Sequence, residues 1–392
     1  MGDETLLLNP GPVVLHPSIR EALSKPMVSH RSTAFSELYE RVRDGVHHIY
    51  TNSRVDGETS TWEGEVLFMN ATATLGMDAA VANFTDSDSQ VLALINGNFG
   101  RRFSQIADRQ CTVDEYEIPW GESFDVDAVR SVIHEGDYDL VTAIHTETST
   151  GMRNPIGAIG EAVADTDALF VVDGVSSIGG ERIHPGEWGI DVSVVDAQKA
   201  MAASPGVCAM FLSDAAIDRL SPDQTYFYAD LHRHLERAVE QHQTPFTSAV
   251  SLFYALDAGV GRILDMGVDE WLTAHEHRAR AWEETAAALG LDLFANPTGE
   301  SDFANTVTAI ELPTAVQEDP DPFFATLREQ SVFVGGGHGH LAGQIFRLGT
   351  MGHLTPTDMD RGVEALGTAF DACGVSVDTS GARETLAAAL EQ

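Results

Sequence analysis

Through residue 213, short apolar runs alternate with stretches whose apolar residues recur every three or four positions. The runs lie at residues 65–70, 91–95, 112–118, 139–144, 168–173, 191–196 and 207–212, and each has the length of one strand. Between them the pattern predicts helices that begin near residues 74 and 100, span 125–134 and lie near 160–164. Strands that alternate with helices in this way form a parallel sheet. We therefore expect an α/β protein with a large, doubly wound, mostly parallel sheet domain.

Two helices are expected before this region, a short one that opens at Pro17 and Ser18 and an amphipathic one over residues 36–50. After residue 248 the pattern changes to two long helices, then strands at 305–312, 331–334 and 344–349, then a last helix over 355–371. This predicts a smaller α+β domain. We expect an N-terminal arm over 1–16, a large domain over 17–265 and a small C-terminal domain over 266–392, joined by a long helix without a flexible linker.

Composition narrows the choice of partners. At 392 residues, of which 43% are hydrophobic, the chain can bury a large core. The formal net charge of −37 argues against nucleic acid and anionic membranes as partners, because both are negatively charged. The acidic residues are spread along the chain rather than gathered in one run, and lysine is almost absent. We take this as the hypothesis of a protein adapted to high salt.

No cysteine or histidine motif points to a disulfide framework or a metal. The three cysteines are widely spaced, and the histidine pairs, such as His338 and His340, form no known ligand pattern. We expect no metal. The chain also shows no signal peptide and no apolar run long enough to span a membrane, so we expect a cytoplasmic protein.

A carboxylate and an amine are placed to face one ligand. Asp173 ends one apolar run, and Lys199 follows a second. Adjacent parallel strands share a crevice at their carboxyl ends, where ligands bind. Lys199 is one of only two lysines, the other being Lys25, and burial near an apolar run lowers the pKa of an amine. This pair suits pyridoxal phosphate (PLP) chemistry, in which a lysine forms the Schiff base and an aspartate keeps the pyridine nitrogen protonated. The alternative is a turn-capping aspartate and a solvent-exposed lysine.

Other polar groups follow strand ends, each with a plainer alternative. Thr72 and Thr74 flank a helix start that suits a phosphate, or they are ordinary caps. Phe99 follows a strand and either covers a flat cofactor or belongs to the core. The polar run at 145–151 indicates a ligand crevice or a hydroxyl-rich turn. Arg347 faces solvent, or it grips a carboxylate with its two-pronged donor geometry.

The glycine-rich segment at 335–340 does not predict a dinucleotide site. It is not followed by a β-α-β unit, and the chain has no P-loop motif. We interpret it as a mobile loop over a crevice.

These motifs together resemble the class V PLP-dependent aminotransferases, most closely the alanine-glyoxylate and serine-pyruvate aminotransferase branch. NPGPVVLHP, NATATLGMDAA, NGNFGRR, HTETSTG, VVDGVSSIGG, DAQKAMAASPG and LAGQIFRLG match that family in order and at similar intervals over almost the whole chain. The resemblance implies the aminotransferase fold (fold type I) and a homodimer with its active sites at the subunit interface.

The resemblance also assigns roles around the cofactor ring. Lys199 would be the Schiff-base lysine and proton shuttle, and Asp173 would pair with the pyridine nitrogen. Val175 and Phe99 would pack on the two faces of the ring. Thr148 would contact the ring hydroxyl.

The phosphate and the substrate have their own implied residues. The phosphate would be held by Thr72, Ala73, Thr74 and Gln198, and by Thr244 of the other subunit. Arg347 would bind the substrate carboxylate, with the backbone near Gly11 closing over it. The chain departs from the family in having Ala-Thr-Ala-Thr where Gly-Ser-Gly-Thr is usual, and Gln241 where some members have tyrosine.

We therefore expect a transaminase that moves an amino group from alanine, serine or aspartate to a 2-oxo acid such as glyoxylate or pyruvate by a ping-pong mechanism. The alternatives are a 2-aminoethylphosphonate or aspartate transaminase of the same class, a cysteine desulfurase-like PLP lyase, and a non-catalytic PLP-binding protein. A nicotinamide dehydrogenase is a more distant alternative. The desulfurase needs a thiolate on a loop over the cofactor, and no cysteine lies in the stretch before Arg347.

Overall fold

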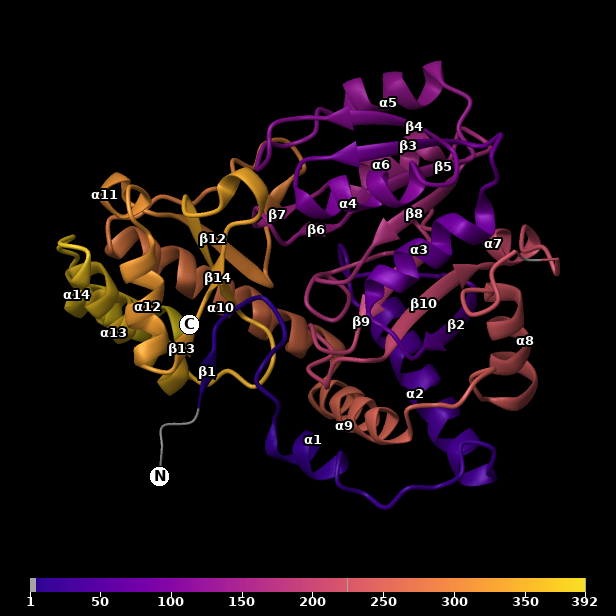
Figure 1. The fold of residues 1–392 in the computed structure, drawn as a ribbon, viewed down its shortest axis with the longest axis horizontal. Helices are drawn as coiled ribbons and strands as arrows, with labels where there is room; N and C mark the ends of the chain where they lie inside the picture. Colours follow the sequence, from indigo (N-terminus) through magenta and orange to yellow (C-terminus); the bar gives the residue numbers. More distant parts are fainter. Residues whose placement is uncertain (1–4, 224, 392) are drawn as a thin grey trace.

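A computed structural model describes residues 5–223 and 225–391, so part of the predicted arm, residues 1–4, lies outside the described residues. The larger part of the molecule is built on a seven-stranded sheet with the order β2-β10-β9-β8-β5-β3-β4 (Figure 1). Its strands are β2 (Gly64–Met69), β3 (Gln90–Ile95), β4 (Thr112–Glu117), β5 (Leu140–Ile144), β8 (Leu169–Asp173), β9 (Val192–Asp196) and β10 (Cys208–Ser213). Strands β9, β8, β5, β3 and β4 pair in parallel, and β10 is antiparallel to both of its neighbours. The predicted mostly parallel sheet is confirmed.

Helices connect these strands and cover the sheet (Figure 1). They are α1 (Pro17–Ala22), α2 (Thr33–Thr51), α3 (Ala73–Phe84), α4 (Asn98–Ala107), α5 (Val126–Glu135), α6 (Ile156–Val163), α7 (Asp214–Asp218), α8 (Leu231–Gln241) and α9 (Val250–Met266). Capping side chains determine where two of these helices begin: the Ser32 hydroxyl accepts from the Phe35 N–H at the start of α2, and the Asp125 carboxylate caps α5. One large cluster of buried apolar side chains extends from α2 through the sheet to Leu272.

A second cluster of buried apolar side chains forms the C-terminal part of the molecule. It is built from α10 (Val268–Ala288), α11 (Thr314–Gln317), α12 (Asp321–Glu329), α13 (Pro356–Ala372) and α14 (Thr379–Leu390) around the antiparallel sheet of β12 (Val307–Glu311), β15 (Ile345–Gly349) and β14 (Gly335–Gly336). Helix α10 contributes Trp271 to the first cluster and Trp282 to the second, so it runs between them. The domain limits drawn from the sequence stay a prediction.

Several short elements complete the fold. They are β1 (Leu6–Leu7), β6 (Thr146–Glu147), β7 (Met152–Arg153), β11 (Asp302–Phe303), β13 (Val332–Phe333) and the 3-10 turn η1 (Gly339–Leu341). Strand β1 pairs in parallel with β13, and the side chains of Leu6 and Leu8 enter the second cluster. Strand β1 is therefore packed among C-terminal elements, and Figure 1 shows it beside β13.

Two predictions about the C-terminal third are corrected. The helix expected to be the last one is followed by α14, whose Ala382 and Leu386 are buried in the second cluster. The segment at 335–340 is not a loop throughout, because Gly335–Gly336 form β14 and pair with β15. A Cβ at Gly335 would lie 3.0 Å from the Pro10 ring and 3.3 Å from the Arg347 Cβ, so close packing, rather than mobility, accounts for this glycine.

Among the described residues, no helix is both long enough and apolar enough to cross a membrane.

Candidate active site

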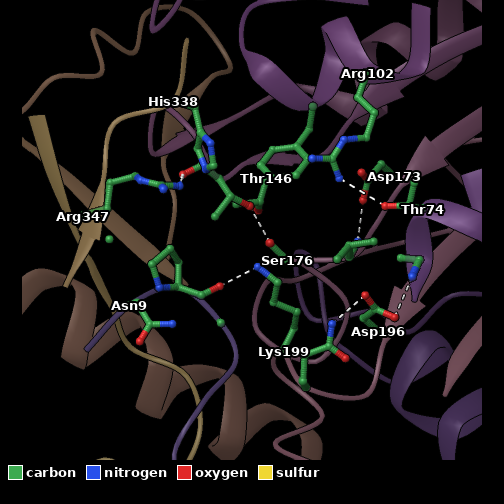
Figure 2. Close-up of a pocket in the computed structure, with 18 of the residues that line it drawn as sticks. Asn9, Thr74, Arg102, Thr146, Asp173, Ser176, Asp196, Lys199, His338 and Arg347 are labelled. Atoms are coloured by element: carbon green, nitrogen blue, oxygen red, sulfur yellow. Dashed lines mark hydrogen bonds between the residues drawn. The ribbon is translucent and has the colours of Figure 1, made fainter. Parts of the chain in front are cut away.

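A cavity of about 370 Å³ opens where the carboxyl ends of β8 and β9 face the N-terminal arm and β15 (Figure 2). Most of the site residues predicted from the sequence line this cavity: Gly11, Ala73, Thr74, Phe99, Thr148, Asp173, Val175, Gln198, Lys199 and Arg347. Thr72 and Thr244 are not among the lining residues. Segments separated by more than three hundred residues are thus brought to one site.

Lys199 lies in the turn after β9, with its amine inside the cavity. The Nζ donates a hydrogen bond of 2.5 Å to the carbonyl oxygen of Pro10. The arm passes so close that a Cβ on Gly11 would lie 2.9 Å from the lysine Cδ and Cε. Burial and the positive charge of Arg347 together lower the pKa of Lys199 to about 8, against the opposing effect of Asp173. The amine therefore loses its proton far more readily than an exposed lysine does.

Asp173 is the last residue of β8, and β8 pairs in parallel with β9, which leads to Lys199. Burial raises the pKa of its carboxyl to about 7, although the Val175 N–H donates to Oδ1 at 2.8 Å. No other hydrogen bond from a described residue reaches this carboxylate, so it has capacity for a further donor. Beside it, the hydroxyls of Thr148 and Ser176 lie 2.5 Å apart.

Phe99 is held in place by a buried carboxylate. Glu147 accepts hydrogen bonds from the backbone N–H groups of Phe99 and Gly100 at 3.0 and 3.1 Å and so caps the start of α4. A Cβ on Gly97 would lie 2.2 Å from the Glu147 Cγ, so this position requires glycine. The Phe99 ring lies on the cavity wall at 75° to the His338 ring, with the two ring centroids 5.9 Å apart.

The start of α3 carries the residues expected to hold a phosphate, and a carboxylate lies among them. Asp196 accepts the Ala73 N–H at 2.8 Å and the Gln198 Nε2 at 2.7 Å. Burial raises the pKa of Asp196. Thr74 lines the cavity, whereas Thr72 is the N-cap of α3 and its side chain makes no capping hydrogen bond. Two of the expected phosphate donors are thus already engaged by Asp196.

Arg347 lies in the middle of β15, and its guanidinium is buried in the cavity wall rather than on a solvent face. Its Nε and one terminal nitrogen donate to the carbonyl oxygen of Gly336 at 3.0 and 2.7 Å, and the other donates to the carbonyl of Thr148 at 2.9 Å. Burial lowers its pKa to about 10, so it stays positively charged at neutral pH. The backbone contacts fix a cationic fork at the wall opposite the start of α3 (Figure 2).

Thr244 lies outside this cavity, in the segment between α8 and α9. Its hydroxyl lies 2.5 Å from that of Ser248 and donates to the carbonyl of Phe246 at 3.0 Å. Arg31 donates to the carbonyl oxygens of Thr244 and Pro245 at 2.7 and 2.8 Å and so fixes the backbone of this segment. Its predicted role at the other subunit's site stays a prediction.

Sequence reasoning missed several lining residues, among them Asn9, Arg102, Asp196 and His338. Asp196 ends β9 as Asp173 ends β8, so the rule that selected one carboxylate would have selected both. Arg102 follows Phe99 on the same helix, and the sequence gives no sign that it faces the cavity. His338 was attributed to a mobile loop.

The residues present fit the cofactor that the resemblance implies. An amine of lowered pKa suits its aldehyde, and a buried carboxylate with a free acceptor position suits a protonated pyridine nitrogen. Phe99 and Val175 supply apolar surface for the ring, and Thr74 lies in the first turn of a helix, a place suited to a phosphate.

Comparison with known proteins points to the same family. A sequence model of the family described as aminotransferase class-V matches residues 19–226. The chain is 32% identical over 381 residues to an uncharacterized aminotransferase of Methanocaldococcus jannaschii, covering 96% of this chain and 95% of that protein.

Solved structures of similar proteins align along the whole chain. The ureidoglycine-glyoxylate aminotransferase of Bacillus subtilis is 26% identical, with a TM-score of 0.91 and coverage of 100% of this chain and 99% of that one. The pyridoxamine-pyruvate aminotransferase of Mesorhizobium loti is 27% identical, with a TM-score of 0.90 and coverage of 100% and 98%. The chain therefore belongs to the class V aminotransferases and is a PLP-dependent aminotransferase of fold type I.

Proposed function

We propose that this aminotransferase moves an amino group from a small amino acid, such as alanine, serine or aspartate, to glyoxylate or pyruvate by a ping-pong mechanism. The observation that carries the proposal is that Lys199, Asp173 and Arg347 line one cavity of a size suited to a small substrate beside a cofactor. The names of the two similar enzymes of known structure, which include glyoxylate and pyruvate, support the acceptor.

Different residues of the chain perform different parts of the reaction. PLP, when bound, supplies the electron sink that stabilises negative charge at the substrate's α carbon. Asp173 would hold a proton at the pyridine nitrogen, because the negative charge of its buried carboxylate pairs with the protonated ring. Lys199, with a pKa of about 8, has a fraction of neutral Nζ near neutral pH that takes a proton from the α carbon and returns one in the second half reaction.

Arg347 orients the substrate. Its planar fork binds the carboxylate that amino acids and 2-oxo acids share, which places the α carbon on the Lys199 side of the cavity. Arg347 and the arm at Pro10 enclose that space and limit water.

The alternatives differ in what the cavity must offer. A 2-aminoethylphosphonate or aspartate transaminase would use the same residues with a second acidic group on the substrate. A cysteine desulfurase-like lyase needs a thiol at the cavity, and none of the described lining residues is a cysteine. A non-catalytic PLP-binding protein would not need both the lysine and the arginine in place.

We include in the proposal a homodimer in which Thr244 of each subunit contributes to the phosphate site of the other. The exposed side chains of Tyr226 and Phe227, near Thr244 in sequence, offer apolar surface for such an interface. The proposal also includes adaptation to high salt, which the net charge of −37 suggests, and a division into two domains between residues 265 and 266.

The test uses the only two lysines of the chain as a matched pair. Lys199→Ala and Lys25→Ala variants are assayed in high salt with alanine, serine and aspartate as donors and glyoxylate and pyruvate as acceptors. We expect the Lys199 variant to lose steady-state transamination and the variant at exposed Lys25 to retain it. Retained turnover without Lys199 would overturn the proposal.

A further inference from the structure

Arg102 is a cation without an acidic partner among the described residues. The neighbouring Arg101 pairs with both Glu115 and Glu117, whereas Arg102 makes no ion pair in the part of the chain that the structure describes. The chain has 60 acidic and 23 basic residues, so acidic partners are abundant. Arg102 instead lines the active-site cavity.

The guanidinium of Arg102 is directed toward the start of α3. One terminal nitrogen donates to the Thr74 hydroxyl at 3.2 Å, and the guanidinium lies over the Phe99 ring at 4.7 Å. Figure 2 shows it on the opposite side of the pocket from Arg347. Burial is the main cause of the lowered pKa values of Lys199 and His338, and the positive charge of Arg102 adds a smaller part, so Arg102 acts on the interior of the cavity.

The start of α3 needs such a cation if it is to bind a phosphate. Asp196 occupies the Ala73 N–H and the Gln198 amide, so a negative charge already lies where the dianionic phosphate is expected. The helix N-terminus offers only partial positive charge. Among the described residues, Arg102 is the cation in contact with Thr74.

We propose that Arg102 binds the phosphate of PLP and offsets the negative charge of Asp196 at that end of the cavity. This rests on the proposed use of the cavity, and it adds a residue that the family resemblance did not assign. The same guanidinium would suit any oxyanion, so the second acidic group of a substrate such as aspartate is the competing ligand. The contact with Thr74 favours the phosphate, because Thr74 lies in the first turn of α3.

The test compares two cofactor forms on the full-length protein freed of cofactor. The dissociation constants of PLP and of pyridoxal, which lacks the phosphate, are measured by absorbance titration for the wild type and for Arg102→Gln, Arg102→Lys and Arg101→Gln. We expect Arg102→Gln to weaken PLP roughly tenfold or more, since a charge-assisted hydrogen bond is lost. Pyridoxal affinity should stay within about twofold, Arg102→Lys should recover part of the loss, and Arg101→Gln should change neither constant.

Three results would overturn the proposal. Equal weakening of PLP and pyridoxal would mean that Arg102 only supports the Phe99 ring. Unchanged PLP affinity, with a raised KM for aspartate but not for alanine, would assign Arg102 to the substrate. If the wild-type protein binds pyridoxal as tightly as PLP, the phosphate adds nothing to the affinity, and no residue binds it. In the first two cases the wild-type protein still binds PLP and transaminates, so the proposed function stands apart from this inference.

Discussion

Replacing Lys199 by methionine should make the cofactor-free protein more stable while it abolishes turnover. The lysine places an ammonium in a buried position, and its pKa falls from an ordinary 10.5 to about 8. At roughly 1.4 kcal/mol per pH unit, that shift corresponds to about 3 kcal/mol of destabilisation in the protonated form. Methionine has similar length and no charge, so it removes this destabilisation.

The loss of one hydrogen bond offsets part of this gain in stability. The Nζ donates to the carbonyl oxygen of Pro10, and methionine leaves that acceptor without its donor, which costs about 1–3 kcal/mol if the carbonyl stays buried. We therefore expect a net stabilisation of about 1 kcal/mol at pH 7. The pH dependence is the sharper signature. Between about pH 8 and 10.5 the unfolded chain holds the Lys199 proton and the folded chain does not, so wild-type stability gains a contribution that rises with pH across this window.

The assay is urea unfolding of the cofactor-free wild type and of Lys199→Met at several pH values from 7 to 10.5, in high salt. The difference between the two proteins should favour the variant at pH 7 and shrink or reverse toward pH 10.5. Lys25→Met at the exposed second lysine is the control and should show no such trend. A stability difference that does not change with pH would refute the reasoning, because it would mean that Lys199 titrates alike in the folded and unfolded chains.

Three further predictions concern single contacts. Arg347→Met should raise KM at least tenfold for amino acids and 2-oxo acids alike, in steady-state kinetics, because the carboxylate fork is lost; an unchanged KM would place the carboxylate elsewhere. Gly97→Ala should lower the free energy of unfolding, measured in urea, by about 1–3 kcal/mol, because the added Cβ would meet Glu147. Gly261→Ala is the control: nothing lies within 4 Å of its added Cβ, so the same measurement should show a rise of up to about 1 kcal/mol. Asp196→Asn should tighten PLP several-fold in absorbance titration by removing a like charge, and weaker binding would contradict this.

Much of the fold was predictable because it rests on periodicity. The strands predicted in the first part of the chain all occur, since a strand buried on both faces reads as a continuous apolar run. Helix α14 was missed because its apolar residues are mostly alanines, which mark a buried helix face weakly. Strand β14 was missed because glycine disfavours strands, and only its packing against Pro10 and Arg347 explains it.

The site was predictable where strand ends determine it and unpredictable where distant segments meet. Asp173 and Lys199 follow neighbouring strands, so the topology alone places them together. The hydrogen bond between Asp196 and the Ala73 N–H joins residues 123 positions apart, and no local pattern records it. The same holds for Arg102. That it has no acidic partner among residues 5–223 and 225–391 is visible only once Glu115 and Glu117 are seen to contact Arg101.

The packing of the N-terminal arm also has a consequence for biosynthesis. The Pro10 carbonyl that contacts Lys199 belongs to an arm that is synthesised before the rest of the described chain, yet Leu6 pairs with Val332, and the Leu8 carbonyl accepts from the Gly349 N–H. The segment bearing Lys199 is also synthesised long before those partners exist. Domains generally fold as units in the order of synthesis. We therefore expect a ribosome-bound chain that ends before β15 to hold a formed central sheet but an unfinished active site, and the nascent enzyme to become competent only when its last third is released.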